Sequence, residues 1–256
     1  MVAAATRVGF AIGDWPRPRG FRLAFDCRFV WEGAMSDAPT IPDESPSAAA
    51  PPPRVRPYAH APRLPEDAPI ALETIVRGSW FELEVGPGRG RFLLERALAA
   101  PEAAIVGFEI RRKWATLVDE RLAKRGLRDR ARCFAEDARD VVPRLSNTGQ
   151  VRRVFLHFPD PWWKKRHEKR LVMGEHFLRE VARLLEPGGE LFLQTDVPFR
   201  AEQYTDAGLG HDAFEPAGDA AGSAVLAANP YGARSDREVR AAVDGLPVTR
   251  MRFRKR

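Results

Sequence analysis

The fold is decided by residues 80–99, which have the sequence WFELEVGPGRGRFLLERALA. The run Trp80–Val85 predicts a β-strand, and residues 91–99 repeat apolar side chains at helical spacing. Glycines at positions 86, 88 and 90 lie between them, where a tight turn and a close ligand would exclude a Cβ atom. A glycine turn between a strand and a helix favours a ligand site at the carboxyl end of that strand.

Strands and helices alternate through the rest of the chain. Further strands are predicted at residues 104–110, 131–134, 151–158 and 190–195, and helices at 113–124 and 171–185, the last ended by Pro187-Gly188-Gly189. This alternation predicts an α/β domain with a mostly parallel sheet and helices on both faces. At the C-terminus Met251 and Phe253 alternate with basic residues, which predicts a terminal strand with these two side chains inward.

Composition bounds the class of protein. The chain has 256 residues, 44% of them hydrophobic, and a formal net charge of +6, which favours a polyanionic partner. Its two cysteines, Cys27 and Cys133, are too far apart in sequence to suggest a disulfide framework, and no metal site is predicted. We find no apolar run of the ~18 residues that a membrane helix needs, so a cytoplasmic protein without a membrane association is expected.

The first part of the chain differs in amino-acid composition from the rest. Residues 38–69 hold ten of the 22 prolines and few large apolar side chains, which predicts a disordered or extended linker. We therefore expect an irregular, Pro/Ala-rich extension over residues 1–70 and a folded domain over 71–256. Met35 opens a plausible protein start, so residues 1–34 are hypothesised to be dispensable or not made. An intact-mass measurement of the native protein tests this.

Three acidic residues follow predicted strands and suit an adenosine-containing cofactor. Glu109 can accept both hydrogen bonds of a ribose diol, although a surface glutamate at a strand end is the plainer interpretation. Asp137 can accept a hydrogen bond from an adenine amino group, or it can cap a helix. Glu84 points toward the glycine turn, where a carboxylate would repel a pyrophosphate and suit a cationic amino acid group.

The glycine spacing separates two cofactor classes. A dinucleotide site normally has the pattern G-x-G-x-x-G, whereas Gly86, Gly88 and Gly90 are followed by Arg91 and Phe92. Together with Glu84, this favours S-adenosylmethionine over a nicotinamide dinucleotide.

The most specific segment is residues 158–170, with the sequence FPDPWWKKRHEKR. Two prolines restrict the backbone around Asp160, so its carboxylate has a fixed direction. Trp162 and Trp163 offer flat faces for a stacked base, and the basic residues beyond them suit a phosphate backbone. A proline turn before a solvated helix would explain the basic run alone, but it does not explain the whole constellation.

This segment resembles the signature of bacterial tRNA (guanine-N7-)-methyltransferases of the TrmB type. The resemblance extends from about Trp80 to the C-terminus and includes LEVGPGRG, GFEI, EDA and LQTD. It implies a Rossmann-like S-adenosylmethionine-dependent methyltransferase fold with an antiparallel C-terminal strand. It also implies methylation of N7 in a tRNA guanine, expected at variable-loop position 46. No obligatory protein partner is inferred, and the chain is expected to be a monomer or homodimer.

The resemblance also assigns site residues. It implies that Asp160 is catalytic and that Glu84, Gly86, Gly88, Glu109, Asp137 and Asp160 bind the cofactor. Lys164 and Asp196 match substrate-binding positions, and Arg166, His167, Glu168, Lys169, Arg170 and Leu171 match the RNA-contacting segment. The family usually carries Thr-x-x-Glu near its end, and here Ser235 and Glu238 occupy those positions and are expected to bind substrate. The alignment of residues 206–234 is poor, and the N-terminal extension is unusually long.

Three alternatives are weighed. An exocyclic amino-group methyltransferase would carry Asp-Pro-Pro-aromatic, but this chain has a single proline between Asp160 and Trp162. A catalytically idle RNA-binding protein need not keep the acids for cofactor and catalysis, and a titration with S-adenosylmethionine would identify it. The glycine spacing and the tryptophan-rich basic segment argue against a nicotinamide dehydrogenase.

Overall fold

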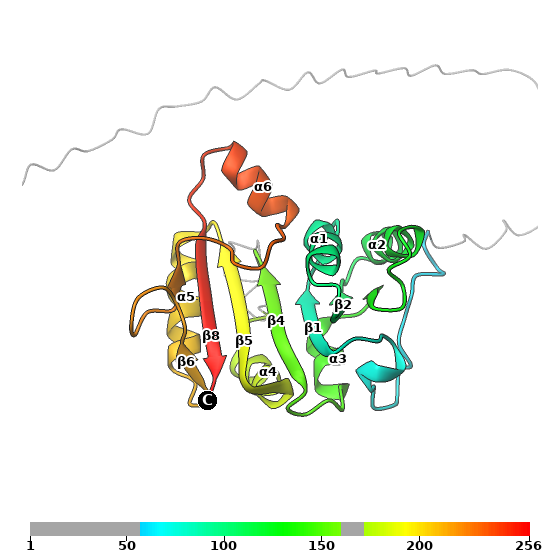
Figure 1. The fold of residues 1–256 in the computed structure, drawn as a ribbon, viewed down its shortest axis with the longest axis horizontal. Helices are drawn as coiled ribbons and strands as arrows, with labels where there is room; N and C mark the ends of the chain where they lie inside the picture. The colour runs from blue at the N-terminus through cyan, green and yellow to red at the C-terminus, as the bar shows by residue number, and fades with distance from the viewer. Residues whose placement is uncertain (1–56, 160–171) are drawn as a thin grey trace, which may run out of the picture. The chain divides into compact units, whose positions relative to one another are not determined.

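The centre of the domain is one eight-stranded sheet with the strand order β3-β2-β1-β4-β5-β8-β6, in which β7 also pairs with β8 (Figure 1). The computed structural model describes residues 57–159 and 172–256, which lie in a compact unit spanning Pro53–Arg256. The strands are β1 (Trp80–Val85), β2 (Ala103–Phe108), β3 (Ala131–Phe134), β4 (Val151–His157), β5 (Leu185–Thr195), β6 (Phe214–Pro216), β7 (Val225–Leu226) and β8 (Thr249–Lys255). The helices are α1 (Arg91–Ala99), α2 (Arg112–Lys124), α3 (Ala138–Val141), α4 (Glu175–Leu184), α5 (Pro198–Leu209) and α6 (Asp236–Val243), with 3-10 turns η1 (Leu72–Thr74) and η2 (Val142–Arg144).

Strand direction confirms the predicted fold class. Strands β1 to β5 are parallel to their neighbours, whereas β8 runs antiparallel to β5, and β6 and β7 run antiparallel to β8. The parallel strands of this sheet therefore end at one edge, where α6 also lies (Figure 1). Met251 and Phe253 of β8 are fully buried, as the alternation of the terminal residues predicts.

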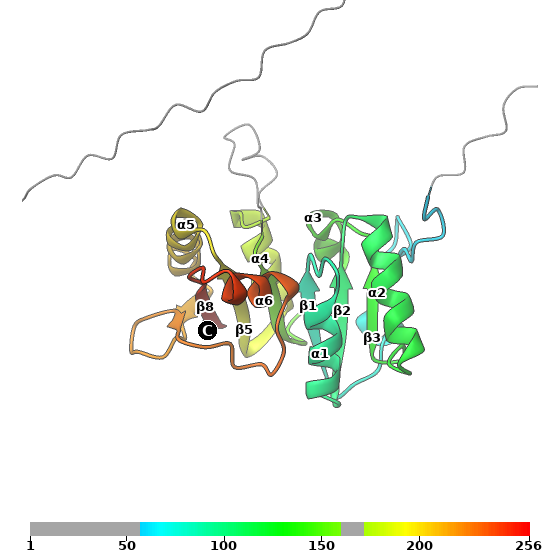
Figure 2. The same ribbon diagram turned by 90° about the horizontal axis from the view of Figure 1, so that it is seen from above.

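Two apolar cores lie on the two faces of the sheet. One core packs α4 and α5 side chains such as Phe177 and Tyr204 against Val85 and Leu193. The other packs α1 and α2 against the opposite face, with Phe92, Val118 and Phe155 buried in it. The view from above shows the same division, with α3, α4 and α5 on one side and α1 and α2 on the other (Figure 2). In the described part of the chain, no helix is both long and apolar enough to span a membrane.

Two predicted boundaries differ from the structure by more than two residues. Helix α4 begins at Glu175 because Gly174 before it has an extended backbone, so residues 172–174 are not helical; residue 171, the expected start, lies outside the described residues. Pro187-Gly188-Gly189 lies within β5 instead of separating a helix from a strand. The β4–β5 register jumps there from Val151↔Leu185 to Arg153↔Glu190, so the extra residues form an irregularity in a strand that continues.

Part of the expected N-terminal extension packs against the domain. Ala61 and Leu64 are buried, and the Leu64 amide donates to the Glu136 carboxylate at 2.9 Å. The Ala135 amide, which follows β3, donates to the Pro62 carbonyl at 2.7 Å. The buried side chains of Ala61, Leu64 and Ile70 therefore anchor residues 57–70 to the domain, although most residues of this segment are exposed.

Candidate cofactor and substrate site

A cavity of about 470 Å³ opens at the carboxyl edge of the sheet. Its volume lies within the ~300–1,000 Å³ typical of small-molecule sites. The cavity lies where the chain order of the strands reverses, because β1 has β2 on one side and β4 on the other. Its walls come from the ends of β1, β4 and β5 and the start of α6, and comprise Glu84, Gly86, Pro87, Gly88, Arg89, His157, Phe158, Pro159, Thr195, Asp196, Val197, Ser235, Asp236 and Arg237.

The glycine turn leaves room beside the backbone. Gly86 and Gly88 have φ values of +71° and +57°, and a Cβ added to either would meet no atom within 4 Å. Gly90 has φ +77° and serves a different purpose, because an added Cβ would lie 2.4 Å from a Val118 methyl group on α2. The first two glycines thus face the cavity, and the third allows α1 and α2 to pack closely.

Glu84 is the most deeply buried acid of the cavity wall. Its Oε1 lies 2.9 Å from Nδ1 of His157, which stands at the end of β4. Among the described residues, the other Glu84 oxygen and His157 Nε2 have no hydrogen-bond partner. Burial raises the pKa of Glu84, the contact with His157 lowers it in part, and the negative charges of Glu109 and Asp236 raise it further. A buried carboxylate with a free oxygen at a cavity fits a cationic group on a ligand.

Glu109 immediately follows β2 and is held by three donors. It accepts hydrogen bonds from the Gly88 amide at 2.8 Å, the Arg111 amide at 3.0 Å and Arg111 Nε at 3.1 Å. An ionised carboxylate has about four acceptor positions, so roughly one remains for a ribose hydroxyl. Glu109 thereby also fixes the position of the glycine turn.

Asp137 caps a helix in this structure. Its carboxylate accepts a hydrogen bond from the Arg139 amide at 2.9 Å at the start of α3 and also pairs with the Arg139 guanidinium. This contact lowers the pKa of Asp137 although partial burial acts against it. The plainer interpretation of Asp137 is therefore realised, and Asp137 and Glu109 lie outside the lining of the 470 Å³ cavity.

Asp196 and Arg237 also line the cavity, and their side chains form an ion pair with each other. Asp196 follows β5, and Arg237 lies in the first turn of α6. The Arg237 side chain is 48% exposed, whereas that of Asp196 is only 8% exposed. The arginine therefore reaches inward from solvent and neutralises the acid at the position expected to bind substrate.

Ser235 and Glu238 are engaged within the protein. Ser235 Oγ accepts a hydrogen bond from the Glu238 amide at 3.1 Å and caps α6. The buried Glu238 carboxylate accepts from Gln194 at 3.1 Å, from Asn229 at 3.0 Å and from Arg250 at 3.0 Å. These contacts fix α6 over the ends of β5 and β8. Ser235 lines the cavity and Glu238 does not.

The segment that carries Asp160 begins at the cavity. The Phe158 amide donates to the Gln194 carbonyl at 2.7 Å, and Phe158 has φ +49°. Pro159, the residue before Asp160, lines the same cavity as Gly86 and Gly88. Asp160, Lys164 and the predicted RNA-contacting residues 166–171 lie outside the described residues.

Five polar side chains of the cavity were not predicted from the sequence: Arg89, His157, Thr195, Asp236 and Arg237. A polar residue in the otherwise apolar end of β4 was the available signal for His157. Its ring lies among aromatic rings, with its centroid 4.1 Å from that of Phe92 and 5.9 Å from that of Phe192. Arg237 and Asp236 could not be placed because the fold of residues 206–234 before them was not predicted.

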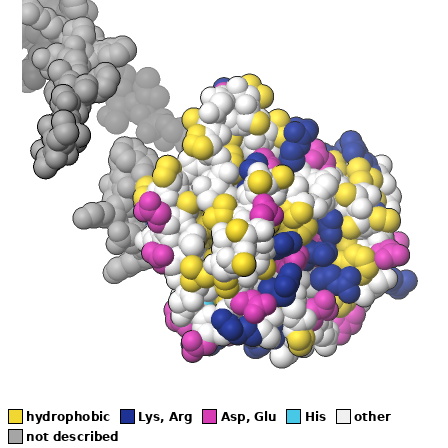
Figure 3. Space-filling model, turned by 60° about the vertical axis from the view of Figure 1, so that its left-hand side comes forward, with side chains coloured by type: hydrophobic (Ala, Val, Ile, Leu, Met, Phe, Trp, Pro, Cys, Tyr) yellow, Lys and Arg dark blue, Asp and Glu magenta, His cyan; other side chains and the backbone are white. Residues whose placement is uncertain are grey.

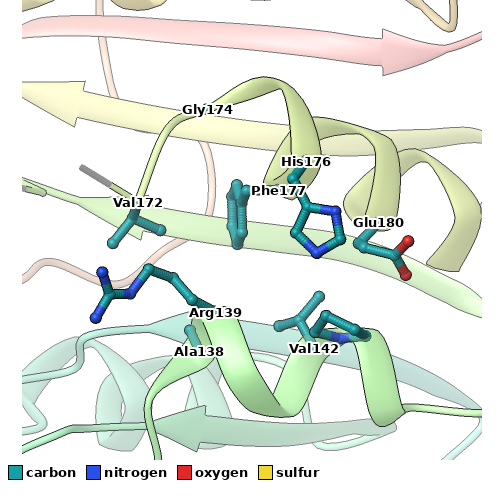
Figure 4. Close-up of a pocket in the computed structure, with 9 residues that line it drawn as sticks. Ala138, Arg139, Val142, Val172, Gly174, His176, Phe177 and Glu180 are labelled. Atoms are coloured by element: carbon teal, nitrogen blue, oxygen red, sulfur yellow. The ribbon is translucent and has the colours of Figure 1, made fainter. Parts of the chain in front are cut away.

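A second cavity, of about 130 Å³, lies between α3–η2 and α4 (Figure 4). Apolar side chains such as Val142, Val172 and Phe177 line it, with His176 and Glu180 on the α4 side. Its volume is below the ~300 Å³ of a typical small-molecule site. We assign it no role.

Comparison with known proteins gives one consistent result. Residues 80–250 match a family model described as "Putative methyltransferase". The tRNA (guanine-N(7)-)-methyltransferase of Myxococcus xanthus is 38% identical over 178 residues, covering 68% of this chain and 83% of that protein. The enzyme of the same name from Anaeromyxobacter dehalogenans is 37% identical over 203 residues, covering 75% of this chain and 98% of that protein.

Proposed function

This chain belongs to the tRNA (guanine-N(7)-)-methyltransferase family, and from that premise we propose that it methylates N7 of a tRNA guanine at variable-loop position 46. It is an S-adenosylmethionine-dependent methyltransferase with a Rossmann-like fold. One observation supports the proposal most strongly. Glu84, the open glycines Gly86 and Gly88, Pro159 and Asp196 line one cavity, which supports a site that holds cofactor and substrate together.

The residues near the end of β1 fit S-adenosylmethionine. In our proposal the free oxygen of Glu84 holds the ammonium group of the methionine moiety, and Gly86 and Gly88 give the backbone close access to it. Glu109 binds the ribose hydroxyls through its remaining acceptor position. Asp137 binds the adenine amino group, for which its carboxylate has to exchange Arg139 for the ligand.

Methylation of guanine N7 does not need a strong base. Bound S-adenosylmethionine supplies an electrophilic methyl group on a sulfonium, and guanine N7 already has a free lone pair. The protein therefore has to hold the guanine in line with the methyl group and stabilise the cationic purine that forms. We assign this to Asp160, which directly follows the cavity residue Pro159, and to Asp196. A carboxylate can also accept from guanine N1–H and N2–H₂ together, which adenine cannot satisfy. In this scheme Lys164 and residues 166–171 contact the RNA.

A substitution of Asp160 tests the proposal. The Asp160→Ala variant is expected to abolish turnover, since loss of an electrostatic group at the reacting atoms costs at least about 10²–10³-fold in rate. Cofactor binding should persist. The assay incubates unmodified tRNA with labelled cofactor and locates N7-methylguanosine by borohydride–aniline strand scission. Asp140→Ala, an exposed acid on α3, is the matched control. Near-normal activity of Asp160→Ala would refute the assignment, and scission away from position 46 would refute the target.

A further inference from the structure

Helix α2 carries cations that the rest of the domain does not neutralise. Arg121 and Arg125 lie on its outer side, Lys113 stands in its first turn, and Arg89 approaches from the glycine turn. In the described part of the chain none of these four forms an ion pair with an acid, and Glu120, the exposed acid of the helix, forms none either. We call Arg89, Lys113, Trp114, Arg121 and Arg125 the α2 ridge.

Elsewhere the arginines are mostly satisfied inside the protein. Arg96 and Arg153 pair with the buried Glu82, and Arg250 and Arg252 of β8 pair with Glu238 and Glu190. On the face that brings α5 and β6 forward, basic and acidic side chains lie side by side (Figure 3). The cations of the α2 ridge differ from these arginines because no described acid pairs with them.

An aromatic ring orders the cations at the start of the ridge. The Arg89 guanidinium lies 5.2 Å from the Trp114 ring centroid, and Lys113 Nζ lies 5.4 Å from the same centroid. Arg121 donates a hydrogen bond to the Arg89 carbonyl at 2.7 Å, which links the helix to the glycine turn. Because these side chains are already positioned, little rotamer freedom is lost when they meet an anion.

The ridge begins at the candidate site and leads away from it. Arg89 belongs both to the ridge and to the lining of the 470 Å³ cavity. Arg125 lies twelve residues beyond Lys113, so the ridge extends about 18 Å at ~1.5 Å per helical residue. In Figure 2, α2 lies on the α1 side of the sheet, far from α4 and α5. A ligand that follows the ridge therefore reaches well past the nucleotide in the cavity.

We propose that the α2 ridge binds the phosphate backbone of the tRNA outside the reacting nucleotide, an inference that rests on the proposed function. A row of unpaired, exposed cations on a rigid helix complements a chain of phosphates, and its contact carries no base specificity. The ridge adds affinity and orientation for the tRNA body, whereas the reacting guanine is held in the cavity.

A charge reversal on the ridge tests this. Arg121→Glu is expected to raise the KM for tRNA about tenfold. Arg125→Glu, whose exposed side chain forms no hydrogen bond with the described glycine turn, should raise it as well, with kcat and cofactor affinity unchanged. Because a phosphate contact is lost, the slope of log affinity against log salt concentration should fall by about 1. Trp114→Ala should change both quantities in the same direction by a smaller amount, because the cations remain but are no longer ordered. Unchanged thermal midpoints of these variants show that the fold is retained.

Arg254→Glu is the matched control. Arg254 is exposed on β8, it forms no ion pair with a described acid, and β8 lies near the other end of the sheet from β3, against which α2 packs. A KM for Arg121→Glu equal to that of the wild type, or an equal rise for both variants, would overturn the ridge assignment. The wild-type lane separates the two proposals: if it yields no N7-methylguanosine on any tRNA, the proposed function fails, whereas an active wild type with an unaffected Arg121→Glu variant refutes the ridge alone.

Discussion

The two walls of the cavity hold their carboxylates differently. On the β1 wall, Glu84 is fully buried beside His157 and keeps one oxygen without a partner among the described residues. On the β5–α6 wall, Asp196 is paired with Arg237, and Glu238 behind it is paired with Arg250. The first wall therefore leaves one oxygen of Glu84 for a cationic ligand, whereas on the second wall an arginine already holds one oxygen of Asp196.

This difference follows from burial. A buried carboxylate without a cation destabilises the fold, and its raised pKa expresses that cost. The cost is tolerated where a ligand supplies the missing charge. Where internal contacts hold a buried acid, as they hold Glu238, an arginine of the protein offsets its charge. We therefore expect acids without a cationic partner in the protein to bind a ligand, and acids with such a partner to stabilise the fold.

The largest expected effect belongs to Glu238. Glu238→Ala removes the acceptor of Arg250, Gln194 and Asn229, and breaking a buried pair by removing one partner costs about 3–5 kcal/mol. Urea unfolding followed by circular dichroism measures this loss. Glu238→Gln retains two acceptor lone pairs and should lose less. A stable Glu238→Ala variant with normal cofactor binding and defective tRNA binding would instead place Glu238 on the substrate.

Substitution of Glu84, in contrast, is expected to affect cofactor affinity more than the free energy of unfolding. Glu84→Gln retains the shape and the contact with His157 but loses the charge, so cofactor affinity should fall by about 10–150-fold, the ~1.5–3 kcal/mol of a charged hydrogen bond. The free energy of unfolding should stay equal or rise, because no charge remains buried. Calorimetric titration and urea unfolding measure the two quantities. Loss of stability with unchanged affinity would remove the contrast between the walls.

The Glu84 carboxyl should also make the free energy of unfolding and the cofactor affinity depend on pH. Because the pKa of Glu84 in the folded protein is raised above its usual 4.5, the folded state holds its proton longer than the unfolded state does. The free energy of unfolding should therefore fall as pH rises from about 4.5 through the raised pKa, and cofactor affinity should increase over the same range. Both slopes are expected to be weaker in Glu84→Gln. Identical pH profiles of the two proteins would show that another group is titrating.

Much of the β1 wall could be predicted from sequence because its signals are local. Residues 80–85 and 91–99 form the predicted strand and helix at the predicted bounds, and the glycines between them have the positive φ values that only glycine adopts readily. Glu84 and Glu109 end or follow neighbouring parallel strands, so they lie at one edge of the sheet.

The β5–α6 wall depends on contacts between residues that are distant in sequence. Asp196 meets Arg237 only because α6 returns over β5, and Glu238 meets Arg250 only because β8 inserts antiparallel beside β5. Strands β6 and β7 have only three and two residues and pair with the distant β8, which is why the region before Ser235 was not predicted. Residues 57–70 illustrate the same limit, because composition describes their prolines but not the surface that covers Ala61 and Leu64.

The glycine turn offers a smaller effect with a close control. Gly88→Ala and Gly126→Ala both place a side chain at positive φ with no atom within 4 Å, so each should cost about 1–2 kcal/mol of stability. Only Gly88 lines the cavity, so only Gly88→Ala should also weaken cofactor binding, by tenfold or more. Titration of both variants measures this. Equal affinity in the two variants would mean that the ligand does not approach the turn closely.

The smallest expected effect belongs to Arg237, and it tests whether the pair on the β5–α6 wall is a switch or a support. The Arg237 side chain is about half exposed, and an ion pair of that kind contributes only about 0–1 kcal/mol, so Arg237→Ala should unfold at nearly the wild-type urea concentration. Arg250→Ala is the contrasting variant, because its side chain is 19% exposed and its loss leaves Glu238 buried with its charge uncompensated. Since Arg237→Ala leaves Asp196 free, cofactor affinity should be unchanged and the KM for tRNA should shift. If Arg237→Ala instead unfolds as easily as Arg250→Ala, the Asp196–Arg237 pair supports the fold, and the two acids of that wall are held for the same reason.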